Sequence, residues 1–356
     1  MLSKQNINKK VTLAKKSNLL VTLADKNYVQ QAKQLFSSVY WNAGWDGDYM
    51  LLAHEIPEEE LKWFREKGIL IKICEPLEDK KEKYVYAPVV LDKFYLFTEE
   101  FKQWKNIVFL DSDIIVQSSL DGLTKIENFG AVRDIDFKLL DTYFFNPEKI
   151  QSKNINYKLN VPAFNSGVFS FNTDIITPDM FRELNRLFSE NHKEFKYLDQ
   201  ATLNLYFNNN WQKLPLLYNI FVVCFNFRLP AKIQGIILHF ITTPDHHPAL
   251  WSPENPYYHE WKANLEKAEL IDLTKIPKVK KMKVLQMQYY SVLLKILSHE
   301  HIRHKIHIFQ INYYKFSTSL KHLFGLPKRM IGFYGSIIKD KNPVLYNRLL
   351  KIKNKT

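Results

Sequence analysis

The stretch NIVFLDSDIIVQSSL, residues 106–120, is an apolar run that contains two carboxylates, Asp111 and Asp113. The apolar residues around them predict a central strand that is buried on both faces. Side chains alternate across a strand, so residues two apart point to the same face and these carboxylates should converge. Buried charges must be paired or bind a metal ion. The stretch therefore predicts a ligand site at the end of this strand.

The sequence before this stretch alternates strand patterns with helix patterns. The predicted strands are 19–24, 49–54 and 69–74, and the predicted helices are 29–40, 57–68 and 87–104. Such alternation indicates an α/β fold, with a mostly parallel sheet that is covered on both faces. Ligands bind beyond the carboxyl ends of the strands in such sheets. Asp111 and Asp113 are expected at that edge.

The pattern is less regular after residue 121. It predicts strands at 130–136, 164–172 and 235–240, and helices at 177–188 and 198–207. Thr177, which precedes Pro178, has the features of a helix N-cap followed by proline at the first helical position. We expect this half to be a mixed extension of the same sheet.

The composition is typical of a globular protein. The chain has 356 residues, 46% of them hydrophobic, which is enough for one large or two ordinary domains. Cys74 and Cys224 lie in apolar runs without metal-type spacing, so we expect buried free thiols. No apolar run reaches the roughly 18 residues that cross a bilayer, and the basic start is not followed by a signal-peptide core. We expect a cytoplasmic protein without a transmembrane helix.

The positive charge is concentrated at the end of the chain. The net charge is +13, and residues 275–356 carry 18 Lys or Arg against 2 acids. We expect a basic N-terminal extension (1–17), an α/β domain (18–270) and a basic, aromatic-rich, helical C-terminal region (275–356). Segments such as KVLQMQYYSVLLKIL (283–297) are suited to an anionic membrane surface, which predicts peripheral binding to the inner face of the membrane. Nucleic acid is the alternative partner for such a region.

The Asp-x-Asp spacing alone has little meaning, because it occurs at three places: Asp46/Asp48, Asp111/Asp113 and Asp134/Asp136. The first pair flanks Gly47 in a predicted turn, where aspartate needs no functional explanation. The third ends a predicted strand and stays open. Only the middle pair ends a strongly apolar strand in the centre of the alternating pattern.

Paired carboxylates are hard oxygen ligands that suit Mg²⁺ or Mn²⁺. Such an ion commonly fills its remaining positions with phosphate oxygens of the substrate. Neither G-x-x-x-x-G-K-[ST] nor G-x-G-x-x-G occurs, and the chain has only 10 glycines. A metal ion would therefore carry much of the phosphate recognition.

Several ordered blocks resemble the retaining glycosyltransferases of family eight, which include glycogenin and bacterial lipopolysaccharide galactosyltransferases. The blocks are VTLADKNYVQQAKQLFSSV (21–39), LDKFYLF (91–97), NIVFLDSDIIVQSSLDGL (106–123), GAVRD (130–134), FNSGVFSFNTD (164–174), LDQATLNLYF (198–207) and ILHF (237–240). The resemblance covers roughly residues 18–262. It implies a GT-A (Rossmann-like) fold and metal-dependent transfer of a hexosyl group, with retention, from a UDP-sugar to a hydroxyl of a glycan or glycolipid. Cell-surface polysaccharide or lipopolysaccharide synthesis is the implied setting.

The resemblance also implies the site residues. Those that hold Mn²⁺, or Mg²⁺, would be Asp111, Asp113 and His239. Those that bind the UDP-sugar donor would be Ala24, Asp25, Asn27, Tyr28, Lys93 and Ser112, the first four of them lining the nucleoside pocket. Those that surround the transferred sugar, and are the catalytic candidates, would be Asp134, Asn165, Asp199 and Gln200.

Four of these assignments have a structural alternative. From the sequence alone, His239 on its apolar strand is expected to be a hydrogen-bonded core histidine. Residues 165–167 would form a β-bulge, since glycine inside a strand often marks one. Asp199 would cap the helix that follows it. Tyr28 would belong to the apolar face of its helix.

The sequence departs from the family pattern after His239. Family members continue to a glycine and then to a lysine that contacts the diphosphate, whereas HFITTPDHHPALW (239–251) has neither. His246 or His247 would replace that cation, or would simply be solvated. Two other functions stay open: a degenerate transferase core with a basic nucleic-acid- or membrane-binding tail, and a nucleotidyltransferase. The second is disfavoured because the chain lacks a glycine-rich phosphate loop near its first strand.

Overall fold

The computed structural model describes residues 16–78, 86–134, 138–222, 234–241, 249–279, 281–297 and 299. The strands in these ranges are β1 (Lys16–Asp25), β2 (Asp48–His54), β3 (Leu70–Cys74), β4 (Trp104–Leu110), β5 (Ile114–Val116), β6 (Phe129–Arg133), β7 (Phe164–Asn172), β8 (Gln212–Leu214), β9 (Ile220–Phe221) and β10 (Ile237–His239). The α-helices are α1 (Val29–Ser38), α2 (Glu58–Glu66), α3 (Pro147–Lys153), α4 (Met180–Asn191), α5 (Leu198–Tyr206), α6 (Tyr258–Ala268) and α7 (Val284–Leu297).

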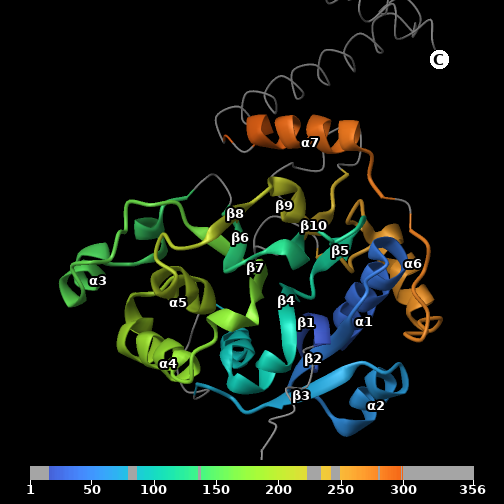
Figure 1. Ribbon diagram of the computed structural model, residues 1–356, viewed down its shortest axis with the longest axis horizontal. Coiled ribbons are helices and arrows are strands. Elements are labelled where there is room, and N and C mark those ends of the chain that lie inside the picture. Colours follow the sequence, from blue (N-terminus) through green and yellow to red (C-terminus); the bar gives the residue numbers. More distant parts are fainter. Residues whose placement is uncertain are drawn as a thin grey trace, which may run out of the picture. The chain divides into compact units, whose positions relative to one another are not determined.

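Seven strands form one sheet in the order β3-β2-β1-β4-β7-β6-β8 (Figure 1). β1 runs parallel to β2 and β4, β2 to β3, and β6 to β8, whereas β7 is antiparallel to both of its neighbours. The prediction of an α/β fold with a mixed, mostly parallel sheet is confirmed.

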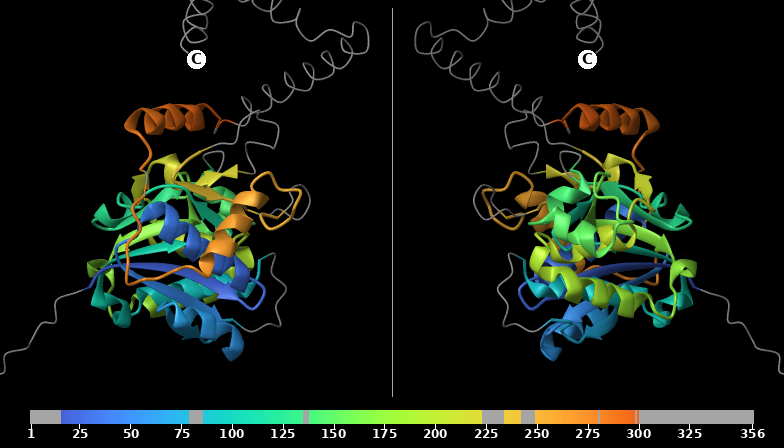
Figure 2. Two further views of the ribbon diagram at one scale, coloured as in Figure 1. Left: turned by 90° about the vertical axis from the view of Figure 1, so that its right-hand side faces the viewer. Right: turned by 90° about the vertical axis from the view of Figure 1, so that its left-hand side faces the viewer.

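Alternate residues of β1 point into two separate cores. Leu20 and Ala24 pack in the core that includes α1, α2 and α6. Leu19 and Val21 pack in the core that includes α4 and α5. Figure 2 shows α1 and α6 on one side of the sheet and α4 and α5 on the other. The sheet is thus covered on both faces, as the alternating pattern predicts.

The prediction of one continuous strand around Asp111 and Asp113 is wrong. β4 ends at Leu110 and β5 begins at Ile114, and the two strands belong to different sheets. β5 lies in a three-stranded sheet of order β5-β10-β9. The sequence cannot distinguish these arrangements, because the apolar residues on both sides of the carboxylates are equally buried. The carboxylates therefore lie in the turn that joins two sheets.

The segment before β4 is helical, as predicted, but it forms two 3₁₀-helices, η2 (Pro88–Phe97) and η3 (Glu99–Gln103). In η2, Leu91, Phe94 and Phe97 are fully buried. Their spacing of three residues places them on one face of a 3₁₀-helix, which has three residues per turn. The sequence shows apolar character here, but that character does not separate the two helix types.

The prediction that Thr177 caps a helix is wrong. α4 begins at Met180 with Asp179 as its N-cap residue. The backbone carbonyl of Thr177 accepts a hydrogen bond from the Met180 amide at 3.2 Å, so Thr177 and Pro178 belong to a turn before the helix. Cys74 is a buried free thiol, as predicted, whereas Cys224 lies outside the described residues.

The described part of the basic C-terminal region packs against the α/β unit. Leu294 on α7 is buried in the same core as α1. Lys281 Nζ lies 2.5 Å from Asp121 Oδ2, and the Met282 amide donates to Ser118 Oγ at 3.0 Å. None of the helices within the described ranges has the length and apolarity needed to cross a membrane. Residues 300–356, which carry much of the predicted basic region, lie outside the description.

Candidate metal and donor site

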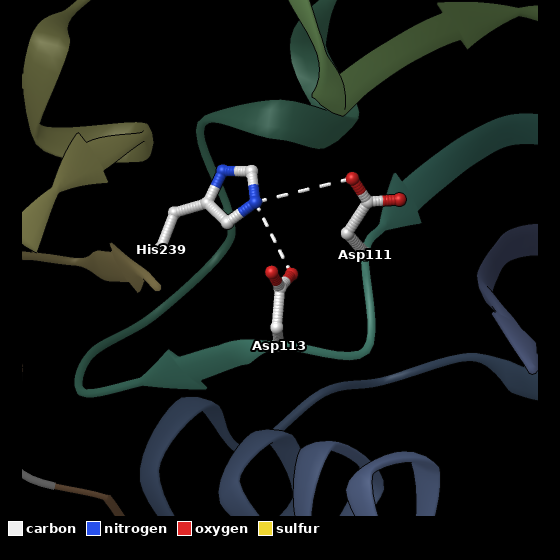
Figure 3. Close-up of side chains that lie close together, drawn as sticks. All are labelled: Asp111, Asp113 and His239. Atoms are coloured by element: carbon white, nitrogen blue, oxygen red, sulfur yellow. Dashed lines mark ion pairs between the residues drawn. The ribbon is translucent and has the colours of Figure 1, made fainter. Parts of the chain in front are cut away.

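Asp111, Asp113 and His239 converge on one point (Figure 3). His239 Nε2 lies 3.2 Å from Asp113 Oδ1 and 3.9 Å from Asp111 Oδ2. One ligand atom from each of the three side chains lies within 4.8 Å of the others. The three groups predicted from the sequence to act together are therefore brought together.

Backbone hydrogen bonds hold the turn that carries the two carboxylates. The Asp111 amide donates to the Gly167 carbonyl of β7 at 2.8 Å, and the Asp113 carbonyl accepts from the Phe240 amide, just after β10, at 3.0 Å. His239 pairs with Ile114 in the antiparallel register of β10 and β5. The register places the imidazole directly beside Asp113.

Gly167 leaves the space that these side chains occupy. A Cβ atom on this residue would lie 2.3 Å from His239 Cε1, 2.6 Å from Asp111 Oδ2 and 2.9 Å from Asn165 Oδ1. Glycine is required here by close approach of side chains. This spatial reason differs from the more common one, a left-handed backbone.

The electrostatics of the three groups favour a cation. Burial raises the pKa of Asp111, with Asp113 adding to the effect and the nearby Lys93 opposing it. Burial opposes protonation of His239, but the carboxylates of Asp113 and Asp111 together outweigh it, so the pKa of His239 is raised. Two carboxylate oxygens and one imidazole nitrogen form a donor set that suits Mn²⁺ and related divalent ions. The residues present fit a metal ion.

Lys93 connects this cluster to the carboxylate of Asp199. Its Nζ lies 3.0 Å from Asp111 Oδ1 and donates to Asp199 Oδ2 at 2.8 Å. The lysine is 2% exposed, and although burial lowers its pKa, the two carboxylates reverse this and raise it. Ser166 Oγ also donates to Asp199 Oδ2, at 2.8 Å. Asp199 lies in the first turn of α5, after the N-cap residue Tyr197, so the sequence alternative of a simple cap is wrong.

A chain of side-chain hydrogen bonds leads away from His239. Its Nδ1 donates to Asn219 Oδ1 at 2.9 Å, because that oxygen can only accept. Asn219 Nδ2 donates to Asn165 Oδ1 at 3.0 Å, and Asn165 Nδ2 donates to Gln200 Oε1 at 2.8 Å. The direction of each bond fixes the direction of the next. In the neutral imidazole this arrangement leaves Nε2 as the nitrogen without a proton, which is the form that binds a metal ion.

The chain continues to the predicted sugar residue Asp134. Gln200 Nε2 donates to the Tyr143 hydroxyl at 2.9 Å, and that hydroxyl donates to Asp134 Oδ2 at 2.7 Å. All three residues are buried. Burial together with Asp134 raises the pKa of Tyr143 well above its usual value, so its proton stays in this bond. Asp136, the second member of that Asp-x-Asp pair, lies outside the described residues.

The β-bulge alternative for residues 165–167 describes part of the structure. Ala131 pairs with Phe169 and Arg133 with Phe164, so residues 165–168 of β7 lie opposite Val132 alone. An irregularity of this kind re-aims side chains at a sheet edge. The bulge and a role in the site are therefore compatible for Asn165.

The predicted nucleoside residues lie at the end of β1 and directly after it. Ala24 is buried at its end, and the Asp25 carboxylate accepts hydrogen bonds from the Asn27 amide at 2.8 Å and from Asn27 Nδ2 at 3.2 Å. Tyr28 makes an edge contact with Trp251, at 5.6 Å between ring centroids. It is partly buried and packs against the core that contains α1. The Tyr28 amide donates to the Asp25 carbonyl at 3.0 Å. Burial raises the pKa of Tyr28, and the carboxylates of Asp113, Asp25 and Asp111 add to this effect.

Other sequence candidates take different places. Ser112 is buried between the two carboxylates in the turn. Asp48 accepts a hydrogen bond from Trp104 Nε1 at 2.7 Å, which agrees with a structural role for the Asp46/Asp48 pair. His246 and His247 lie outside the described residues.

The sequence reasoning missed Asn219 and Tyr143. Asn219 is a polar residue inside the apolar run LPLLYNIF (214–221), which is the same signal that identified Asp111. Tyr143 follows Thr142 and precedes two phenylalanines, and nothing in that pattern marks its hydroxyl as functional. Its role arises from tertiary packing alone.

The sequence model of glycosyl transferase family 8 matches residues 19–244. Galactinol synthase 4 of Arabidopsis thaliana is 23% identical over 207 residues, covering 51% of this chain and 57% of its own length. Galactinol synthase 1 of Solanum lycopersicum is 28% identical over 188 residues, covering 51% and 56%. Glycosyltransferase GlyF of Streptococcus pneumoniae is 26% identical over 224 residues, covering 57% and 49%. The chain spans about half the length of the curated relatives it matches.

Solved structures show the fold. The galactosyltransferase LgtC, in complex with donor and acceptor sugar analogues, has a TM-score of 0.55 at 17% identity, covering 73% of this chain and 98% of its own. Glycosyltransferase GlyE of Streptococcus pneumoniae has a TM-score of 0.51 at 18% identity, covering 78% and 64%. These likenesses confirm the predicted GT-A fold. Because the family match extends over well more than half of the sequence, the chain belongs to glycosyl transferase family 8.

Proposed function

We propose that this chain is a metal-dependent retaining glycosyltransferase that moves a hexosyl group from a UDP-sugar to an acceptor hydroxyl. The observation that carries the proposal is the convergence of Asp111, Asp113 and His239 beyond the end of β4. Ligands bind at this edge in open α/β sheets. Family membership supports the reaction class.

Mn²⁺ is the ion we propose for the cluster, with Mg²⁺ as the alternative. Carboxylates suit both ions, and the imidazole nitrogen favours the transition metal. When bound, the ion would act as a Lewis acid that neutralises charge building on the UDP leaving group. Asp111 and Asp113 supply the negative charge that holds it, and His239 is oriented toward it by Asn219.

Lys93, Asp199 and Gln200 would then serve the transferred sugar. Asp199 supplies negative charge close to the centre that becomes oxocarbenium-like, and Lys93 holds that carboxylate in place. The oxygen of Gln200 already accepts hydrogen bonds from Asn165 Nδ2 and the Ser166 amide. We therefore assign Gln200 and Asn165 positioning roles. Asp134 would accept hydrogen bonds from sugar hydroxyls on the far side of Tyr143.

Release of UDP from a panel of UDP-sugars, with and without Mn²⁺, tests this function. Wild-type protein should release UDP from at least one donor only when Mn²⁺ is present. Asp113→Asn should lose this release, because one of the two ligand charges is removed. The exposed Asp179→Asn serves as the matched control and should behave as wild type. Equal turnover by Asp113→Asn and wild type, or no metal-dependent turnover or binding for any donor, would overturn the proposal.

Asn219 provides a second test, with a readout that does not depend on turnover. Asn219→Ala removes the acceptor that holds His239 Nδ1. Loss of such a partner typically costs 10- to 100-fold in metal affinity, so we expect about that weakening of Mn²⁺ binding. Electron paramagnetic resonance titration with Mn²⁺ measures it, with Asn185→Ala as a control, since the half-buried Asn185 on α4 also donates one hydrogen bond, to the Phe181 carbonyl. An unchanged Mn²⁺ affinity in a folded Asn219→Ala protein would contradict the assignment.

We further propose a glycan or glycolipid acceptor, reached at the inner face of the membrane through the C-terminal region. The support is a stripe on α7 formed by Leu285, Tyr289, Val292 and Ile296, all of them exposed. Their spacing of four, three and four residues places them on one helix face. Lysines precede the helix, and each basic residue near an anionic surface contributes roughly 1 kcal/mol. Cell-surface polysaccharide or lipopolysaccharide synthesis is the setting that such an acceptor suggests.

Liposome flotation tests this part of the proposal. Wild-type protein should float with anionic vesicles and not with neutral ones. A variant with Leu285, Tyr289 and Val292 all changed to serine should bind several-fold more weakly, because three apolar contacts are lost while the charge stays the same. Binding that is unaffected by the triple change would contradict a role for α7. Strong oligonucleotide binding without vesicle binding would favour the nucleic-acid alternative instead.

A further inference from the structure

The hydroxyl of Tyr143 joins side chains from two separate elements. Tyr143 is completely buried at the end of the 3₁₀-helix η6 (Leu140–Tyr143). Its hydroxyl accepts a hydrogen bond from Gln200 Nε2 at 2.9 Å and donates one to Asp134 Oδ2 at 2.7 Å. Gln200 lies on α5, whereas Asp134 directly follows β6. The relative positions of these two site candidates therefore depend on a third residue that the family resemblance does not assign.

The backbone of β7 determines which atom of Gln200 faces Tyr143. The Ser166 amide donates to Gln200 Oε1 at 3.0 Å. A backbone N–H can only donate, so this contact identifies the oxygen and leaves Nε2 on the side of Tyr143. In the same way, the Gly167 amide donates to Asn165 Oδ1 at 2.9 Å, so Asn165 Nδ2 is the atom that faces Gln200. The orientation of both side-chain amides is thus fixed.

The single proton of the Tyr143 hydroxyl has two oxygens within reach. Asp134 Oδ2 lies at 2.7 Å and the Phe164 carbonyl at 3.2 Å. The carbonyl already accepts from Asn204 Nδ2 at 2.9 Å. Hydrogen bonds to a carboxylate are also shorter and stronger than those to a neutral oxygen. The proton therefore goes to Asp134, and the hydroxyl oxygen is left to accept from Gln200.

This bond has a consequence for the carboxylate of Asp134, which is 5% exposed. A buried charge is costly unless it is hydrogen-bonded. The Tyr143 hydroxyl supplies one such bond and so determines where Oδ2 lies. A sugar hydroxyl that binds Asp134 would therefore meet an acceptor whose position is set by Tyr143.

The ring of Tyr143 has a packing role that is separable from the role of its hydroxyl. The ring belongs to the core that includes α4 and α5, and it makes an edge contact with Tyr197 at 5.1 Å between ring centroids. Phenylalanine would keep these contacts and lose only the hydroxyl. Within the described ranges, the hydrogen bonds and ring contacts of Tyr143 do not include the metal cluster or the predicted nucleoside residues.

We propose that Tyr143 is a positioning residue for the transferred sugar, because its hydroxyl holds the Asp134 carboxylate in a fixed position relative to Gln200. This inference rests on the proposed function. The hydroxyl should matter for binding of the hexosyl part of the donor and should not matter for binding of UDP. A role that is only structural would change both affinities together.

Isothermal titration of the full chain with UDP and with UDP-sugars, in saturating Mn²⁺ and without acceptor, tests the proposal. The UDP-sugar is the one in the release panel that wild-type protein binds most tightly. Tyr143→Phe should lower the affinity for this donor by about tenfold, the usual effect of removing a hydrogen bond to a buried charged group. Its affinity for UDP should stay within about twofold of wild type. Tyr40→Phe is the matched control, since the buried Tyr40 donates one hydrogen bond, to the Asp272 carbonyl at 2.9 Å, and should keep both affinities.

Asp134→Ala shows whether Tyr143 acts through Asp134. The double variant Tyr143→Phe/Asp134→Ala should bind the UDP-sugar no more weakly than Asp134→Ala alone, because the effects of residues in one network are not additive. Mn²⁺ affinity, measured by paramagnetic resonance, should stay at the wild-type value in Tyr143→Phe, which also shows that this variant is folded. An unchanged UDP-sugar affinity in Tyr143→Phe, an equal loss for UDP, or additive losses in the double variant overturns this inference alone. Failure of wild-type protein to bind any UDP-sugar overturns the proposed function itself.

Discussion

Gly167→Ala should abolish metal binding while leaving the protein folded. The added methyl group would lie within 3 Å of His239 Cε1, Asp111 Oδ2 and Asn165 Oδ1, and all three belong to hydrogen-bonded or buried side chains that have little room to retreat. Overpacking of this kind costs about 1–3 kcal/mol in stability. Two of the three displaced groups are metal ligands. We therefore expect Mn²⁺ affinity to fall by at least about 100-fold, which is the upper end of the loss seen when a residue that only hydrogen-bonds a ligand is removed.

Gly130→Ala is the matched control for this prediction. Gly130 lies on β6, which pairs with β7, and the three atoms nearest to a Cβ there would all belong to the Ile126 side chain, at 3.0 Å and beyond. The control should lose some stability and keep its Mn²⁺ affinity. Paramagnetic resonance titration and thermal melting of both variants give the two quantities. Wild-type affinity in Gly167→Ala would mean that the metal ion does not bind between Asp111 and His239.

Lys93→Met should strongly destabilise the fold. Lys93 is the buried cation between Asp111 and Asp199, whose side chains are 29% and 8% exposed. Removing one partner of a buried ion pair leaves an uncompensated charge and typically costs about 3–5 kcal/mol. We assign most of this cost to Asp199, since Asp111 is more solvated. Urea denaturation measures the change in the free energy of unfolding.

Two further variants make this prediction specific. Lys102→Met breaks a solvent-exposed pair with Glu99 and should change stability by less than about 1 kcal/mol. The double variant Lys93→Met/Asp199→Asn removes the unpaired carboxylate and should recover part of the loss. If Lys93→Met lowers the free energy of unfolding no more than Lys102→Met does, the carboxylates of Asp111 and Asp199 are solvated in the folded protein and the prediction is wrong.

The sequence predicts the first half of the sheet well, because its strands are short apolar runs between helical patterns. Runs at 19–24, 49–54 and 69–74 correspond to β1, β2 and β3. The convergence of Asp111 and Asp113 is also found, but the reasoning behind it is wrong. Strand alternation was expected to align them, whereas a turn between two sheets does so. Local pattern cannot tell that apolar runs on either side of a carboxylate enter different sheets.

The chemistry of the site is predictable only where a polar residue interrupts an apolar run. Asp111, His239 and Asn219 all carry that signal. Tyr143 carries none, because its hydroxyl acquires a function only when Gln200 and Asp134 are brought to it by packing. Networks of this kind depend on contacts between distant segments, and no single segment encodes them.

The turn 111–113 also has a thermodynamic consequence. Asp111 follows β4 of the large sheet, while Asp113 and His239 lie at β5 and β10 of the small one. Any ion that needs all three is held only while the two sheets remain in contact, so binding and the cohesion of the sheets are linked equilibria. A ligand present at 100 times its dissociation constant adds about 2.7 kcal/mol to the folded state. The concentration of the metal ion in the cell would therefore affect how stably the large sheet and the small sheet stay in contact.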